Sequence, residues 1–190
     1  MDKGDKFFHF VTMLFCFMVF NLGLRWRLKG RGENSVMISP LRVIGTSRIS
    51  LGCGVRMLHH SRIEAFSIDG HLSIGNDVHI GHNFFCTCAA GISIDSGVLI
   101  SDNVAIIDNS HIYDPGLSPT DTRLECAKIV IEKNVTIYRN STILMGVKIG
   151  QGSIVAAGSV VRESVAPSSL VAGAPAIPKK SLLGVTKVEP

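Results

Sequence analysis

Aliphatic residues recur at every sixth position along most of this chain of 190 residues. Residues 131–166 divide without a gap into the hexads IEKNVT, IYRNST, ILMGVK, IGQGSI, VAAGSV and VRESVA. The first position of each hexad is Ile or Val, and the fifth is Val or Ser. A helix repeats near 3.6 residues and a strand alternates with a period of two, so neither element alone explains this period. The repeat predicts a short strand followed by a corner, stacked as the coils of a β-solenoid.

The same period continues toward the N-terminus with irregular joints. Ile74 and Ile80 lie six residues apart, as do Ile94 and Ile100, and Val78 holds a fifth position. We expect the first position to stack from coil to coil in the interior and the fifth to fit beside each corner. The chain is 46% hydrophobic but only 6% aromatic, which agrees with an all-β core of small and branched aliphatic side chains.

Composition limits the partners of such a chain. The net charge of +4 suits a small anionic ligand or a membrane surface, and it is too weak to indicate nucleic acid binding. The five cysteines are odd in number and lack paired C-x-x-C spacing, which is typical of reduced thiols in a cytoplasmic protein. Neither they nor the seven histidines show the ligand spacing of a zinc site, so we expect no metal.

The N-terminal residues 1–32 have a different character. Residues 7–24 are an apolar run, and the basic sequence RWRLKGRG follows it. The favoured interpretation is a helix lying at a membrane surface with its basic residues facing anionic lipid. The run is marginal for a bilayer span, which needs about 20 apolar residues. A single span with a cytoplasmic C-terminal body, or simple packing against the domain, remains an alternative.

The repeat stops between Ile106 and Ile131. We assign residues 108–128 to a protruding loop, which contains most of the turn-rich sequence IIDNSHIYDPG and one histidine, His111. Excursions from a rigid solenoid are where functional residues concentrate. An imidazole titrates near neutral pH and can take the proton of a hydroxyl that attacks a thioester carbonyl. His111 is therefore the candidate general base, and the alternative is a loop histidine that caps a turn.

The segments IGNDVHIGHN, VLISDNVAIIDNSHIYDP, IVIEKNVTIYRNSTILMGVKIGQGSIVAAGSVV and VAGAPAIPKK resemble the hexapeptide-repeat acetyltransferases. Within that family they are most similar to the sugar and polysaccharide O-acetyltransferases of the nodulation-factor, maltose and colanic-acid type. The resemblance implies a left-handed parallel β-helix, a homotrimer, and acetyl-CoA as the acetyl donor. Under it, residues 40–178 form the acyltransferase domain and residues 179–190 a C-terminal tail.

The resemblance also assigns residues on the acceptor side. The motif NSHIYDP matches the sequence around the catalytic histidine of the family, which supports His111. Relatives often carry an acidic residue directly after this histidine, whereas Ile112 stands here, and Asp108 or Asp114 is left to orient the imidazole. The candidate contacts to the acceptor are Asn83, Asp108 and Tyr113.

On the donor side, the resemblance places Ala157, Gly158 and Arg139 along the pantetheine arm of acetyl-CoA. Cationic side chains beyond them can pair with the phosphates as charge-assisted donors, and the candidates are Arg162, Lys179 and Lys180. Ordinary coil packing is the alternative role for the two small residues. A solvated surface pair is the alternative for the two lysines.

The leading functional hypothesis is an acetyl-CoA-dependent O-acetyltransferase acting on a saccharide, either a polysaccharide or a lipid-linked repeat unit. The apolar N-terminus favours a lipid-linked acceptor and a cytoplasmic enzyme at the inner face of the membrane. A small acceptor, such as a free sugar, an amino sugar or a xenobiotic, is the enzymatic alternative. A solenoid that serves only as a scaffold is the non-enzymatic alternative.

Overall fold

The computed structural model describes residues 28–116, 118, 120 and 123–183. The apolar segment at residues 7–24 lies outside these residues, so its three interpretations stay predictions.

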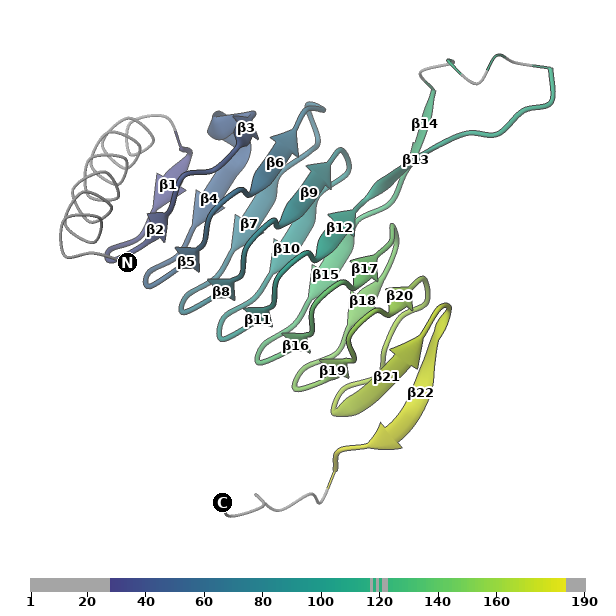
Figure 1. The fold of residues 1–190 in the computed structure, drawn as a ribbon. Coiled ribbons are helices and arrows are strands. Elements are labelled where there is room, and N and C mark those ends of the chain that lie inside the picture. Colours follow the sequence, from purple (N-terminus) through teal and green to yellow (C-terminus); the bar gives the residue numbers. More distant parts are fainter. Residues whose placement is uncertain (1–27, 117, 119, 121–122, 184–190) are drawn as a thin grey trace, which may run out of the picture.

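The chain winds through three parallel sheets, and each coil adds one strand to each sheet, giving an all-β parallel β-helix of about seven coils (Figure 1). Sheet A contains β1 (Gly30–Arg31), β4 (Ile49–Leu51), β7 (Leu72–Ile74), β10 (Ile92–Ile94), β15 (Ile129–Ile131) and β18 (Lys148–Ile149). Sheet B contains β2 (Val36–Met37), β5 (Arg56–Met57), β8 (His79–Ile80), β11 (Leu99–Ile100), β16 (Thr136–Ile137), β19 (Ile154–Val155), β21 (Ser169–Gly173) and β22 (Ala176–Ser181). Sheet C contains β3 (Arg42–Ile44), β6 (Arg62–Ala65), β9 (Phe85–Cys88), β12 (Ala105–Ile107), β17 (Thr142–Ile143) and β20 (Val160–Val161).

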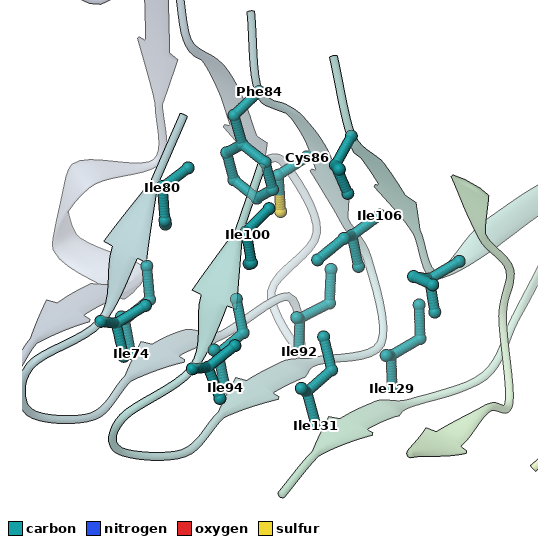
Figure 2. Packing of buried hydrophobic residues seen from close by; sticks show 14 of the residues in the cluster. Ile74, Ile80, Phe84, Cys86, Ile92, Ile94, Ile100, Ile106, Ile129 and Ile131 are labelled. Atoms are coloured by element: carbon teal, nitrogen blue, oxygen red, sulfur yellow. The ribbon is translucent and has the colours of Figure 1, made fainter. Parts of the chain in front are cut away.

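The first hexad position fills the interior, as the period predicts. In sheet A, Ile94 lies in register between Ile74 and Ile131, and all three side chains are buried. Figure 2 shows these stacks together with Ile80 and Ile100 of sheet B. Each fully buried isoleucine contributes roughly 1.5–3 kcal/mol relative to exposure. The repetition of this contact from coil to coil is what stabilises a fold in which every strand before β21 is only two to four residues long.

The fifth position lies beside the corners and is also buried. Where it is Ser, the hydroxyl donates to a carbonyl oxygen of the corner. Ser141 donates to Tyr138 at 2.7 Å, and Ser159 donates to Ala156 at 2.6 Å. A buried hydroxyl without such a partner is costly, so these bonds explain why Ser replaces Val here.

The corners require backbone that only some residues adopt. At the corner between sheets A and B, Gly97 has φ +72° and Asn134 of the next coil has φ +57°. A Cβ added to Gly97 would overlap the Oδ1 atom of Asn134. Glycine and asparagine tolerate this left-handed region better than other residues, which explains their regular spacing.

The paired strands at both ends of the solenoid extend past the expected domain boundaries at residues 40 and 178. β1 pairs with β4 and β2 pairs with β5, so the first coil begins before residue 40. At the other end, β22 pairs antiparallel with β21, and the expected start of the tail at residue 179 falls inside this strand. Backbone pairing defines both ends, whereas the hexad pattern weakens where a coil has a neighbour on one side only.

Candidate functional site

A two-stranded arm leaves the solenoid where the hexads stop. It is built from β13 (Asn109–His111) and β14 (Leu124–Cys126), which pair antiparallel and project from the corner between sheets C and A (Figure 1). The sequence predicted a protruding loop over residues 108–128, and the structure adds a regular ribbon at its base. The ribbon gives His111 a defined register opposite Leu124, which an irregular loop would not.

Asp108 anchors the arm to the preceding coil. Its side chain is fully buried, and its two carboxylate oxygens accept the backbone N–H groups of Ala89, Ala90 and Gly91 at 2.7–2.8 Å. The side-chain amide of Asn109 adds a fourth bond at 3.0 Å. A carboxylate held by this many donors is fixed in position. The burial favours an anchoring role for Asp108 over the acceptor contact expected from the sequence.

His111 lies at the exposed end of β13, and its neighbours are exposed as well. The Tyr113 side chain is 88% exposed and that of Ile112 is 44% exposed. Asp114 forms an ion pair with Arg123 across the arm, with 3.7 Å between Oδ2 and Nη2. The catalytic role of His111, its orientation by Asp114 and an acceptor contact by Tyr113 remain predictions.

A cleft of about 790 Å³ lies on the outer face of sheet A, beside the root of the arm. Cys126 of β14 lines it, and Cys126 pairs with Asn109, two residues before His111. Two residues along a strand correspond to about 7 Å, so His111 lies about that far along the arm from the residue paired with Cys126. The polar residues of its lining are Ser67, Asp69, His71, Ser73, Ser93 and Lys128.

This cleft was not predicted from the sequence. Ser73 and Ser93 occupy the outward position of paired strands, and the triplets LSI and ISI contain that signal. Asp69, His71 and Lys128 come from corners of different lengths, where no repeat indicates which side chains meet. Hydroxyl, carboxylate and ammonium groups together suit a ligand rich in hydroxyls.

The pKa values of two cysteines near the arm are raised. Burial, assisted by the Asp108 carboxylate, raises the pKa of the Cys88 thiol to about 12. Burial and Asp108 also raise the pKa of Cys126. Because the thiolate is the reactive form, both shifts favour the unreactive thiol.

Three of the predicted donor residues meet at one corner, between sheets B and C. The backbone N–H of Gly158 donates to the carbonyl oxygen of Arg139 at 3.0 Å, and Ala157 precedes Gly158 in the same turn. Gly158 has φ +69°, and a Cβ added there meets no atom within 4 Å. The surface outside this corner is therefore open along small residues.

The remaining predicted donor residues lie elsewhere. Arg162 follows β20, on the side of sheet C where the arm leaves β12. Its guanidinium lies 3.9 Å from the carboxylate of Glu163. Lys179 and Lys180 are exposed on β22, at the end of sheet B. Within one chain, the strands of sheet C therefore lie between His111 and the corner that contains Arg139, Ala157 and Gly158.

Asn83 belongs to an asparagine ladder at the corner between sheets B and C. Its side-chain amide donates to Asn103 at 3.0 Å, and Asn103 donates in turn to Asn140 at 3.0 Å. All three have φ between +55° and +60°, so the ladder supports left-handed corner turns. This bonding accounts for Asn83 structurally, and its contact with an acceptor remains a prediction.

Two further observations concern only the residues that the structure describes. None of them groups three His, Cys, Asp or Glu side chains so that they could hold a metal ion. None of the helical segments among them is long and apolar enough to cross a membrane.

Comparison with known families gives two matches. The model described as bacterial transferase hexapeptide (six repeats) matches residues 128–163, and that of the hexapeptide repeat of succinyl-transferase matches residues 71–107. Together they cover coils on both sides of the arm.

Three individual proteins are similar to this chain. The putative lipopolysaccharide biosynthesis O-acetyl transferase WbbJ of Escherichia coli K12 is 30% identical over 123 residues, covering 60% of this chain and 62% of the relative. The galactoside O-acetyltransferase of the same strain is 34% identical over 111 residues, covering 55% and 54%. A hexapeptide-repeat acetyltransferase of Vibrio cholerae, solved with acetyl coenzyme A, has a TM-score of 0.63 at 29% identity, covering 84% of this chain and 74% of its own.

The chain thus spans less than two thirds of the length of both curated relatives. The six-residue repeat and both family models nevertheless agree along the solenoid. The coils at residues 71–107 and 128–163 thus match hexapeptide-repeat transferase families.

Proposed function

We propose that this protein transfers the acetyl group of acetyl-CoA to a hydroxyl of a saccharide, either a polysaccharide or a lipid-linked repeat unit. The observation that carries the proposal is His111 on an anchored arm whose base lines a cleft of about 790 Å³ with serine, carboxylate and ammonium groups. The similarity to a lipopolysaccharide O-acetyl transferase and to a structure solved with acetyl coenzyme A supports it.

His111 acts as the general base in this reaction. Its imidazole takes the proton of the acceptor hydroxyl while the hydroxyl oxygen attacks the thioester carbonyl. Backbone N–H groups of a neighbouring coil stabilise the oxyanion of the tetrahedral intermediate. The C–S bond then breaks, and the proton on the imidazolium passes to the sulfur of the departing CoA. The ester is the second product.

The donor binds along the corner formed by Arg139, Ala157 and Gly158. Its open, small-residue surface suits a narrow pantetheine arm, and the cationic Arg162, Lys179 and Lys180 remain candidate phosphate partners. A homotrimer resolves the separation within one chain, because the arm of one copy can reach the donor corner of the next. The exposed Ile112 and Tyr113 side chains on the arm are suited to such a contact.

The donor half of the proposal is tested by a thermal-shift titration with CoA and acetyl-CoA, which needs no acceptor. Ligand at about 100 times its Kd should stabilise the folded state by roughly 2.7 kcal/mol. His111→Ala and His111→Gln should keep this shift and lose acetyl transfer by about 10²-fold or more. No shift at millimolar ligand would instead support a non-catalytic scaffold.

The similarity to a galactoside O-acetyltransferase favours a second candidate, a small free sugar as acceptor. Transfer to simple glycosides at rates matching those on oligosaccharide repeat units would support it. Association with the inner face of the membrane is a separate prediction, checked by sedimentation of the full chain with anionic vesicles.

A further inference from the structure

A second groove, of about 380 Å³, lies on the outer face of sheet B. The paired strands β5, β8 and β11 present Arg56, His79 and Leu99 toward it at equivalent positions of the register. Arg139, from the corner after β16, lines its other end. The groove therefore runs from Arg56 past His79 and Leu99 to the corner proposed to hold the donor.

The middle of the groove is apolar. Leu99 is 43% exposed, and Leu58 lines the groove beside it. Four successive strands, β5, β8, β11 and β16, separate its two ends by three steps of about 4.8 Å, or roughly 14 Å. This length suits an extended molecule with an uncharged central part better than a lone ion.

The two arginines of the groove differ from those on sheet C in their ion pairing. Arg42 and Arg62 on sheet C both form ion pairs with Glu64, at 3.1 Å and 2.8 Å. Within the described part of the chain, neither Arg56 nor Arg139 has an acidic partner within ion-pair distance. Two guanidinium groups thus face the groove with their charge uncompensated.

One acidic residue lines the groove, and it is already engaged. Asp102 accepts the backbone N–H of His82 through Oδ1 at 2.8 Å. The lining therefore carries two permanent positive charges, one carboxylate held at a corner, and the imidazole of His79. Such a groove favours an anion at its Arg56 end, because β5 lies two strands away from the corner that holds the carboxylate of Asp102.

We propose that Arg56 and His79 bind an oxyanion carried by the acceptor saccharide, either a carboxylate or a phosphate. Arg56 is suited to a bidentate contact with two oxygens of that group. His79 of the next coil donates to the third oxygen of a phosphate, or to one of the two oxygens of a carboxylate. The uncharged part of the acceptor lies over Leu99 and points toward Arg139 and the donor corner. This specificity rests on the proposed acetyl transfer, and it makes an acidic saccharide the substrate class.

Binding by the full chain, measured by isothermal titration calorimetry without donor, tests the inference. The probes are methyl glucoside, methyl glucuronoside and glucose 1-phosphate, which are neutral, carboxylate and phosphate forms of one sugar. At least one anionic probe should bind with a Kd at least tenfold lower than that of the neutral probe. Arg56→Gln and His79→Gln should remove this preference and leave the weak binding of the neutral sugar unchanged.

Arg42→Gln is the matched control, because it removes another exposed arginine, from sheet C, while Glu64 keeps its bond to Arg62. It should retain the full preference. Whichever anionic probe binds more tightly identifies the carboxylate or the phosphate as the recognised group.

The inference is overturned if no probe binds, if the three probes bind alike, or if the preference survives in Arg56→Gln. A thermal shift with CoA on the same samples separates this result from the proposed function. A CoA shift without anion preference refutes only the groove. An anion preference without a CoA shift refutes acetyl transfer and leaves an anionic saccharide site.

Discussion

At the scale of single residues, the arm depends on one buried carboxylate. Asp108 joins β12 to β13 and accepts three consecutive backbone N–H groups of the preceding coil. These three bonds tie Asp108 to the preceding coil, so the aspartate sets where the arm leaves the solenoid. His111 inherits its position from that anchor, since only Asn109 and Ser110 lie between them.

Asp108→Asn should lower the free energy of unfolding by about 1–3 kcal/mol, because the amide nitrogen would face a backbone donor and leave it unsatisfied. Urea denaturation measures the change. Asp114→Asn is the control: its ion pair with Arg123 is about half exposed, and its loss should cost at most about 1 kcal/mol. Equal effects of the two substitutions would contradict the anchoring role.

At the scale of elements, the corners matter as much as the strands. Strands of two residues form few hydrogen bonds of their own. Each corner must therefore place the next strand in register with the strand of the preceding coil. Gly97 and Gly158 occupy corners of similar φ, +72° and +69°, but only Gly97 is closely covered by the next coil. This pair separates backbone strain from steric overlap.

Gly158→Ala should cost about 1–2 kcal/mol of folding stability, the strain of a left-handed non-glycine residue. Gly97→Ala should cost more, because its Cβ also overlaps Asn134. Thermal denaturation ranks the two variants. The same Gly158→Ala protein should bind CoA more weakly, and unchanged CoA binding would remove Gly158 from the donor site.

At the scale of the whole molecule, the proposed active site is divided between copies. His111 and the donor corner lie at opposite ends of the strands of sheet C. Neither end alone therefore holds both the general base and the donor site. A closed cyclic assembly brings these two ends together at every interface.

Mixing tests this division. His111→Ala and Arg139→Ala should each lose most activity as pure proteins. Co-expression should restore it at roughly a quarter of the interfaces, where an intact arm meets an intact corner, if assembly is random. Sedimentation should give a mass near three times the 20.4 kDa of one chain. No recovery in a mixed trimer would place the whole site within one chain.

The repeating part of this protein was determined by the sequence alone. Each hexad is a local rule, and the same side chain must fit the same place in every coil, so the solenoid, its isoleucine stacks and the position of the arm followed from the period. The clefts depend on residues whose neighbours come from corners of unequal length, such as His71 and Lys128. The anchoring of Asp108 and the uncompensated charge of Arg56 were decided only by the tertiary structure, because no periodic rule specifies which side chains from different coils meet.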